Sequence, residues 1–177
     1  MAPNRLEFRP LTELGLSVLQ VWLAKPHLQY WWREQNTTLD SLREKYLPRI
    51  RGEADATPYL VFQSGEPIGY IQSYCAHNGT ADWWPDTPGP GVYGIDQFIG
   101  DEDRLDQGLG TQMVSQFLEQ LFADHSVVEV RVDPRPDNLR AIRCYAKVGF
   151  REVGPISTPD GPAIMMVIKR ANFAALI

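Results

Sequence analysis

The sequence has little of what metal centres and disulfide frameworks require. It contains two cysteines and three histidines in 177 residues. Cys75 and Cys144 fall in separate predicted elements and show no metal-ligand spacing, so we interpret both as reduced thiols that pack. The histidines are scattered along the chain. We therefore predict no metal site.

Long hydrophobic runs and excess positive charge are also missing. No run of about 18 apolar residues occurs, so we expect no membrane span, and the first residues lack the apolar centre of a signal peptide. The net charge of −5 argues against nucleic acid as a partner. It is compatible with a cationic substrate, although many globular proteins are mildly acidic. We expect a cytoplasmic globular protein with one domain over residues 1–177.

What the sequence does contain is a series of strand and helix patterns in the order β α α β β β α β α β β, which predicts a mixed sheet with helices on its faces. The expected strands cover residues 6–10, 59–63, 68–76, 92–99, 128–132, 150–153 and 163–169. The expected helices begin near residues 14, 39, 109 and 139. Thr37 or Thr38 is expected to cap the second helix, and Pro48 to end it. Asp137 or Asn138 is expected to cap the last helix, and Gly149 to end it. Tyr30-Trp31-Trp32 is expected in a loop, and residues 77–91 form a long loop of the kind that is often functional.

The stretch from Gly94 to Thr111 joins the central strand to a helix through a glycine loop, Gln107-Gly-Leu-Gly-Thr111. Glycines let backbone N–H groups approach an anion, and the helix N-terminus adds a favourable dipole, so this loop is a candidate pyrophosphate cradle. A single Gly-x-Gly is weak evidence, and neither Gly-Lys-Ser/Thr nor a third glycine is present. On this pair alone, an ordinary tight turn before a helix is the better interpretation.

A second block strengthens the anion-binding interpretation. Asn138-Leu-Arg-Ala-Ile-Arg-Cys-Tyr-Ala-Lys-Val-Gly-Phe150, together with the glycine loop, resembles the GCN5-related N-acetyltransferase (GNAT) superfamily. The superfamily usually has Gln or Arg where this chain has Leu105. A closer resemblance, to aminoglycoside 6'-N-acetyltransferases, covers nearly the whole chain. It is carried by Trp31-Trp32, Tyr46-Leu-Pro48, Thr57-Pro-Tyr59, Gly65 to Tyr70, Trp83-Trp84, Gly94 to Gln97, Asn138 to Tyr145 and Thr158 to Pro162.

The resemblance implies an α/β (α+β) fold of the GNAT type, with a mixed, mostly antiparallel central sheet of about six to seven strands flanked by about four helices. It also implies transfer of the acetyl group of acetyl-coenzyme A to the 6'-amine of an aminoglycoside, by direct attack in a ternary complex and without a metal. Such an enzyme confers antibiotic resistance. Its partner is a small-molecule drug, and it works as a monomer or a homodimer.

The resemblance also implies which residues hold the coenzyme. Successive backbone N–H groups of the glycine loop would bind the pyrophosphate, namely those of Gln107, Gly108, Leu109, Gly110 and Thr111. The main chain near Gln97 and Phe98 would pair with the pantetheine arm, and an N–H group there would polarise the acetyl carbonyl. Asn138 would bond the arm, which is compatible with capping its helix.

Two side chains are candidates for the proton transfers. Asp96 lies in mid-strand, where a carboxylate is costly unless it is satisfied or faces a cavity. It would bind the 6'-ammonium and take its proton, directly or through water; the alternative is a structural acid bonded to neighbouring N–H groups. Tyr145 would protonate the leaving sulfur, because a phenol with a pKa of about 10 holds its proton at neutral pH. Its alternative is a buried packing tyrosine.

A polycationic sugar requires carboxylates and aromatic faces. The resemblance places aminoglycoside-binding acids at Asp133 and Asp160. Asp82 is a weaker candidate, because its position is offset from the one that the resemblance implies. Turn chemistry is the alternative for these acids, because Asp is common before Pro or Gly. Three tryptophans are candidates to line the pocket, with one of each adjacent pair facing the site: Trp32, Trp83 and Trp84.

Two other functions stay open on the sequence. A GNAT enzyme could acetylate a polyamine, a hydroxamate-precursor side chain or a protein N-terminus, although the acidic and aromatic loops favour a compact polycation. The other alternative is a non-catalytic module that binds aminoglycosides or coenzyme A. The presence of both Asp96 and Tyr145 argues against such a module.

Overall fold

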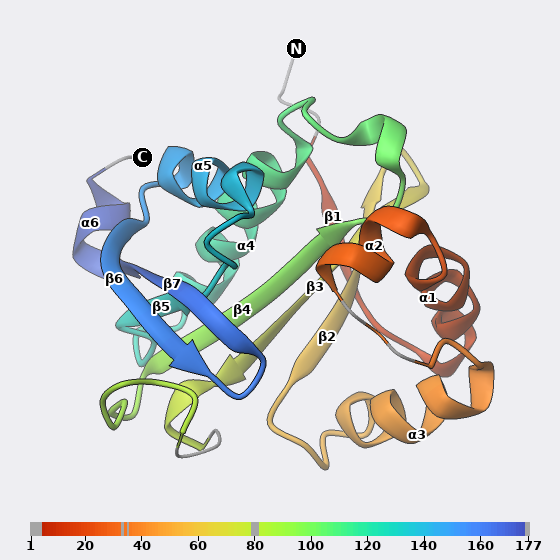
Figure 1. Cartoon of the computed structure of the whole chain (residues 1–177), viewed down its shortest axis with the longest axis horizontal. Coiled ribbons are helices and arrows are strands. Elements are labelled where there is room, and N and C mark those ends of the chain that lie inside the picture. Colours follow the sequence, from red (N-terminus) through yellow and green to blue (C-terminus); the bar gives the residue numbers. More distant parts are fainter. Residues whose placement is uncertain (1–4, 33, 35, 79–81, 176–177) are drawn as a thin grey trace. The chain divides into compact units, whose positions relative to one another are not determined.

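Seven strands form a mixed sheet in the part of the chain that the computed structural model describes, residues 5–32, 34, 36–78 and 82–175 (Figure 1). Their order across the sheet is β1-β2-β3-β4-β5-β7-β6. The strands are β1 Glu7–Pro10, β2 Thr57–Gln63, β3 Glu66–Cys75, β4 Val92–Ile99, β5 Glu129–Val132, β6 Arg151–Thr158 and β7 Gly161–Lys169. The β4–β5 pair is parallel, whereas β1–β2, β5–β7 and β6–β7 are antiparallel. The predicted mixed, mostly antiparallel sheet is confirmed.

The contacts of the backbone group the chain into two compact units, and β3 and β4 contribute residues to both. The first unit comprises Met1–Gln72 with Gln97–Gly110, and the second comprises Ser73–Asp96 with Thr111–Ile177. The single domain over residues 1–177 stays a prediction.

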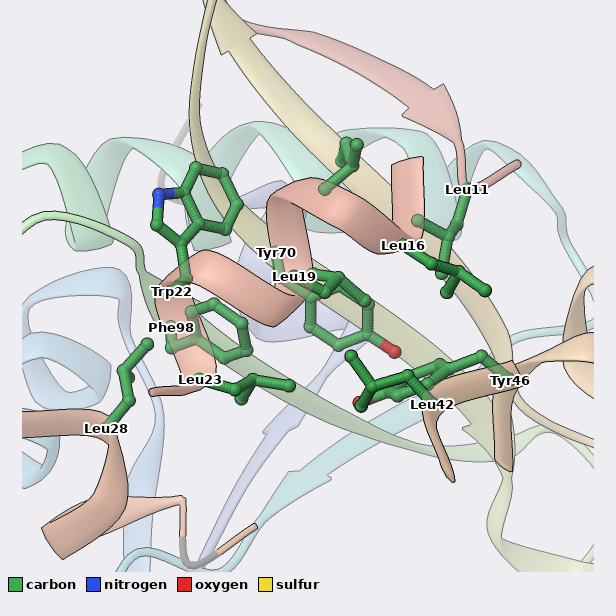
Figure 2. Packing of buried hydrophobic residues seen from close by; sticks show 11 residues of the cluster. Leu11, Leu16, Leu19, Trp22, Leu23, Leu28, Leu42, Tyr46, Tyr70 and Phe98 are labelled. Carbon is green, nitrogen blue, oxygen red and sulfur yellow. The ribbon is translucent and has the colours of Figure 1, made fainter. Parts of the chain in front are cut away.

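The first unit has its own apolar core between helices and strands. Helices α1 (Leu16–Leu23), α2 (Pro26–Trp31) and α3 (Leu39–Ile50) bury one face each. Figure 2 shows the cluster, whose members are at most 6% exposed: Leu11, Leu16, Leu19, Trp22, Leu23, Leu28, Leu42, Tyr46, Leu60, Tyr70 and Phe98. The rings of Tyr70 and Phe98 stack with centroids 5.3 Å apart. Each buried side chain of this size contributes roughly 1.5–3 kcal/mol, so the cluster fixes the end of β4 at Phe98.

Two predictions for the first unit were wrong: the loop at Tyr30-Trp31-Trp32 and the end of the second helix at Pro48. Pro26 begins α2, so Tyr30 and Trp31 lie in a helix and only Trp32 follows it. Proline fits the first helical position because no N–H group is needed there. Pro48 lies inside α3, which continues to Ile50. The predicted cap of α3 is confirmed, since Thr38 Oγ1 accepts the N–H of Ser41 at 3.3 Å.

The second unit contains α4 (Leu109–Ala123, whose first two residues belong to the first unit), α5 (Leu139–Val148) and α6 (Arg170–Ala174). Asn138 caps α5 by accepting the N–H of Ala141 at 3.1 Å, and Gly149 ends it with a φ of 110°. Both features were predicted, whereas α6 was not. None of the described helices is long and apolar enough to cross a membrane.

Strand β6 is longer than predicted. It was expected over residues 150–153, but it pairs with β7 until Thr158 faces Gly161, with a register shift between Glu152 and Gly154. Pro155 is tolerated because β6 is an edge strand of the sheet. The tight turn that follows carries Asp160.

Candidate active site

Asp96 lies on β4, and Asp133 directly follows the end of β5, the neighbouring parallel strand. The β4–β5 ladder pairs Val92 with Glu129 and ends where Gly94 pairs with Arg131, although β4 continues to Ile99. Each aspartate comes two residues after that last pair. Open sheets bind ligands at the carboxyl ends of their parallel strands. Because the β4–β5 ladder ends before the two aspartates, both carboxylates lie in a region where a ligand can bind.

The pKa of Asp133 reflects its burial and its interaction with the carboxylates of Asp96 and Asp160. Burial, as the largest cause, and the negative charges of Asp96 and Asp160 together raise it from 3.8 to about 7, although a hydrogen bond from Trp83 opposes the rise. The indole Nε1 of Trp83 donates to Asp133 Oδ2 at 3.0 Å. Near neutral pH, Asp133 is therefore poised between its protonated and ionised forms, and a bound cation would favour the ionised form.

Tyr74 on β3 belongs to the same cluster and was missed by the sequence analysis. Burial, together with the charges of Asp96 and Asp133 and the proximity of Tyr145, raises the pKa of its phenol well above the usual value. The phenol therefore keeps its proton. Its ring lies directly on Gly94, where an added Cβ would come within 2.2 Å of the ring. A glycine inside a strand marks such close approaches, so Gly94 was the available signal.

Tyr145 projects from α5 and is 6% exposed. Its ring packs edge-on against Phe150 with centroids 5.4 Å apart. The packing alternative and the catalytic role are therefore compatible, because the buried ring holds a phenol that also interacts with Tyr74.

The three acidic and aromatic residues of the long segment before β4 lie in different surroundings. Trp83 is partly buried and bonds Asp133, whereas Trp84 is 5% exposed in an apolar cluster with Ala76, Val92 and Met165. Asp82 is exposed. Trp83 also packs against the edge of that apolar cluster. The substrate-binding roles of Asp82, Trp83 and Trp84 stay predictions.

Asp160 lies exposed in the β6–β7 turn. The turn is closed by Thr158, whose hydroxyl accepts the N–H of Asp160 at 3.2 Å and donates to the carbonyl of Gly161 at 2.9 Å. The turn thus holds Asp160 through its backbone. The carboxylate of Asp160 raises the pKa of Asp133, which brings this third acid into the cluster.

The predicted coenzyme segment of the first unit has features that fit the group. Within the described residues, the side-chain oxygen of Gln97 is buried without a hydrogen-bond partner, so it could accept an N–H group of a pantetheine arm. Gly108 has a φ of 80° and open space around its Cα just before α4 begins. Gln107 Nε2 donates to the carbonyl of Asp103 at 2.6 Å, which braces the loop and leaves binding to backbone N–H groups.

The remaining predicted residues have clear packing partners in their own units. Trp32 packs edge-on against Tyr70 and Phe98 in the first unit, with centroids 5.8 and 4.9 Å apart. Thr111 and Cys144 contact in the second unit, where Thr111 Oγ1 donates to Sγ at 3.6 Å. Burial raises the pKa of the Cys144 thiol, so it is not an activated nucleophile. No group of three or more potential metal ligands occurs among the described residues.

Comparisons with known proteins show the family to which the chain belongs. A family model described as an acetyltransferase (GNAT) domain matches residues 12–158. The aminoglycoside N(6')-acetyltransferase type 1 of Klebsiella pneumoniae is 45% identical over 172 residues, which are 96% of this chain and 86% of that protein.

Two solved structures show the same fold. The structure of aminoglycoside acetyltransferase AAC(6')-Ib with coenzyme A and kanamycin is 44% identical, covers 96% of this chain and 98% of that one, and has a TM-score of 0.90. The structure with ribostamycin and coenzyme A is 43% identical, covers 97% of both chains and has a TM-score of 0.91.

Proposed function

Because this chain belongs to the acetyltransferase (GNAT) domain family, we propose that it transfers the acetyl group of acetyl-coenzyme A to the 6'-amine of aminoglycosides such as kanamycin. Its relatives of similar length are named aminoglycoside N(6')-acetyltransferases. Solved structures of such enzymes hold coenzyme A together with kanamycin or ribostamycin. The biological outcome of the reaction is resistance to the drug.

One observation carries the proposal: the carboxylates of the second unit are concentrated. Burial, Asp96 and Asp160 together raise the pKa of Asp133 to about 7. Like charges held this close destabilise one another, and a ligand with several ammonium groups removes the repulsion. Trp83 adds an aromatic side chain that can pack on a sugar ring. An aminoglycoside offers both the charges and the rings.

The chain's own residues then perform the proton transfers of the reaction. Acetyl-coenzyme A supplies the activated thioester. Asp96 binds the 6'-ammonium and accepts its proton, directly or through water, which frees the amine lone pair. An N–H group at Gln97 or Phe98 polarises the acetyl carbonyl. The amine forms a C–N bond to the acetyl carbon and the C–S bond breaks, while Tyr145 gives its phenolic proton to the departing sulfur. The second proton that leaves the nitrogen restores the phenol of Tyr145.

The coenzyme is held by groups of the chain that bear no charge. Backbone N–H groups from Gln107 to Thr111 bind the pyrophosphate at the start of α4, where the helix dipole favours an anion. Asn138 offers its side-chain NH₂ to the pantetheine arm while its oxygen caps α5. The proposal places the enzyme in the cytoplasm, where acetyl-coenzyme A is used, as a monomer or a homodimer.

The test is the release of free thiol from acetyl-coenzyme A with kanamycin A, in parallel with an analogue that carries a hydroxyl in place of the 6'-amine. We expect turnover with the first compound and none with the second. Turnover with both would overturn the regiochemistry, and turnover with neither would overturn the antibiotic assignment. Asp96→Asn should lower kcat by about 10²–10⁴-fold; near-wild-type turnover would remove Asp96 from the chemistry.

A further inference from the structure

Arg131 lies on β5 two residues before Asp133, with 7% of its side chain exposed. Its Nη1 and Nη2 donate to the two carboxylate oxygens of Asp86 at 2.6 and 2.9 Å. Its Nε donates to Glu129 Oε1 at 2.7 Å. A bidentate pair of this kind fixes direction as well as distance, so the guanidinium and Asp86 hold each other in one arrangement.

The residues that Arg131 holds belong to the segment between β3 and β4. The guanidinium carbon lies 5.5 Å from the ring centroid of Trp84, which is buried beside Val92 and Met165. The neighbouring Trp83 donates to Asp133 at 3.0 Å. Asp133 directly follows Val132, the last residue of β5. Arg131 and Asp133 therefore hold the segment at two places, one on β5 and one just beyond its end.

We propose that Arg131 and Asp86 form a latch that positions Trp83 against Asp133 and so shapes the acidic pocket for its cationic substrate. The inference rests on the proposed function, since the pocket is the aminoglycoside site described above. Both latch residues are positioning residues that act through Trp83. They differ from the predicted site residues because neither needs to contact the drug.

The electrostatics of the latch make Asp86 the residue to change. The hydrogen bonds from Arg131 hold the pKa of Asp86 below its usual value, so the pair is ionised at neutral pH. Asp86 is 53% exposed, whereas Glu129 is 15% exposed and still pairs with Arg131 when Asp86 is neutral. Asp86→Asn therefore loosens the latch without leaving a buried charge unpaired.

The pH dependence separates a latch from a simple charge effect. Asp133 interacts with Asp96 on β4, Asp160 in the β6–β7 turn, Trp83 in the latched segment and Tyr74 on β3. Removing a negative charge at Asp86 would by itself lower the pKa of Asp133. Loss of the Trp83 hydrogen bond would raise that pKa, because the bond stabilises the ionised carboxylate. The two effects have opposite signs.

The experiment compares kanamycin kinetics of the wild type, Asp86→Asn and Asp86→Glu, with Glu7→Gln as a control at the exposed Glu7–Arg9 pair of the first unit. We expect Asp86→Asn to raise the KM for kanamycin about tenfold, the effect of losing one hydrogen bond to a charged group, with little change in kcat or in the KM for acetyl-coenzyme A. The midpoint of the pH profile of kcat/KM should move up. Asp86→Glu should restore much of the loss, and Glu7→Gln should behave as the wild type.

A double-mutant cycle with Trp83→Phe, which removes only the indole N–H and part of the ring, tests whether the latch acts through Trp83. Latch action predicts that the two changes raise KM by less together than the product of their separate effects. Additive effects, an unchanged KM or a midpoint that moves down would overturn the proposal. If the wild type itself shows no turnover, the proposed function fails, and acrylamide quenching of tryptophan fluorescence still tests the latch. Greater quenching in Asp86→Asn supports it, and equal quenching rejects it.

Discussion

Asp133 holds its proton more tightly in the folded protein than in the unfolded chain, because burial and then Asp96 raise its pKa from 3.8 to about 7. Between these values the folded state binds more protons, so this residue lowers the free energy of unfolding as the pH rises from about 4 to about 7. Asp133→Asn removes the charge and keeps an oxygen for the Trp83 hydrogen bond. We expect the variant to be more stable than the wild type by roughly 4 kcal/mol at about pH 8, since the shift spans about three pKa units and each unit corresponds to roughly 1.4 kcal/mol.

The gain in stability should be small near pH 4, where the carboxyl of the folded wild type is protonated and that of the unfolded chain is about half protonated. Urea unfolding at about pH 4 and about pH 8 measures the difference. A gain of equal size at both pH values would contradict the raised pKa. The same variant should bind kanamycin more weakly, because the charge that destabilises the free protein is the charge that the drug neutralises.

Tyr145 tests the separation of packing from proton donation. Tyr145→Phe keeps the ring that packs on Phe150 and removes only the hydroxyl. We expect kcat to fall about 10- to 100-fold, with little change in the melting temperature or in the KM for acetyl-coenzyme A, because the phenol acts only when the sulfur leaves. Steady-state thiol release and thermal unfolding measure both. Tyr93→Phe is the matched control, since Tyr93 lies on β4 next to Gly94 and faces the opposite side of the strand.

At the scale of the element, β4 can carry the cluster only because residue 94 is glycine. The Cβ of an alanine there would fall 2.2–2.4 Å from atoms of the Tyr74 ring, so Gly94→Ala must displace the ring or the strand. We expect a loss of about 1–3 kcal/mol in stability, as for other overpacked sites, and a higher KM for kanamycin. The double variant Gly94→Ala/Tyr74→Leu should recover stability but not KM. If Gly94→Ala changed neither, Tyr74 would have no fixed place in the site.

Local sequence signals predicted the elements whose ends are set locally. The caps at Thr38, Asn138 and Gly149 follow from side-chain and glycine chemistry within a few residues. The continuation of α3 past Pro48 and the length of β6 do not follow from local chemistry. Burial of one helix face decides the first, and pairing with β7 decides the second. Pairing between distant segments overrides local preference.

The residues of the candidate site also divide into those that the sequence could predict and those that it could not. Asp96, Asp133 and Tyr145 could be named from the resemblance to acetyltransferases. Tyr74 and Arg131 could not, because their roles arise from strand register and from a ring that lies on Gly94. No motif marks a residue that acts through a cross-strand contact.

For the whole molecule, the net charge of −5 acts in opposite directions on the two substrates. Kanamycin is a polycation, and acetyl-coenzyme A is an anion. In the first unit, acids also flank the glycine loop, at Asp103 and Asp106 among others, whereas Asp101 pairs with Lys25. Salt screens attraction and repulsion alike. We therefore expect the KM for kanamycin to rise about threefold or more between ~0.05 and ~0.5 M NaCl, while the KM for acetyl-coenzyme A stays level or falls.

Initial rates with one substrate saturating and the other varied measure these dependences. A sugar substrate with a single amine should show a smaller rise than kanamycin, because fewer charges interact with the acidic cluster. A parallel rise of both KM values would mean that positive charge elsewhere on the chain binds the coenzyme. In that case the uncharged pyrophosphate cradle proposed for Gln107 to Thr111 would be wrong. Opposite salt dependences follow only if carboxylates bind the drug and backbone N–H groups bind the coenzyme.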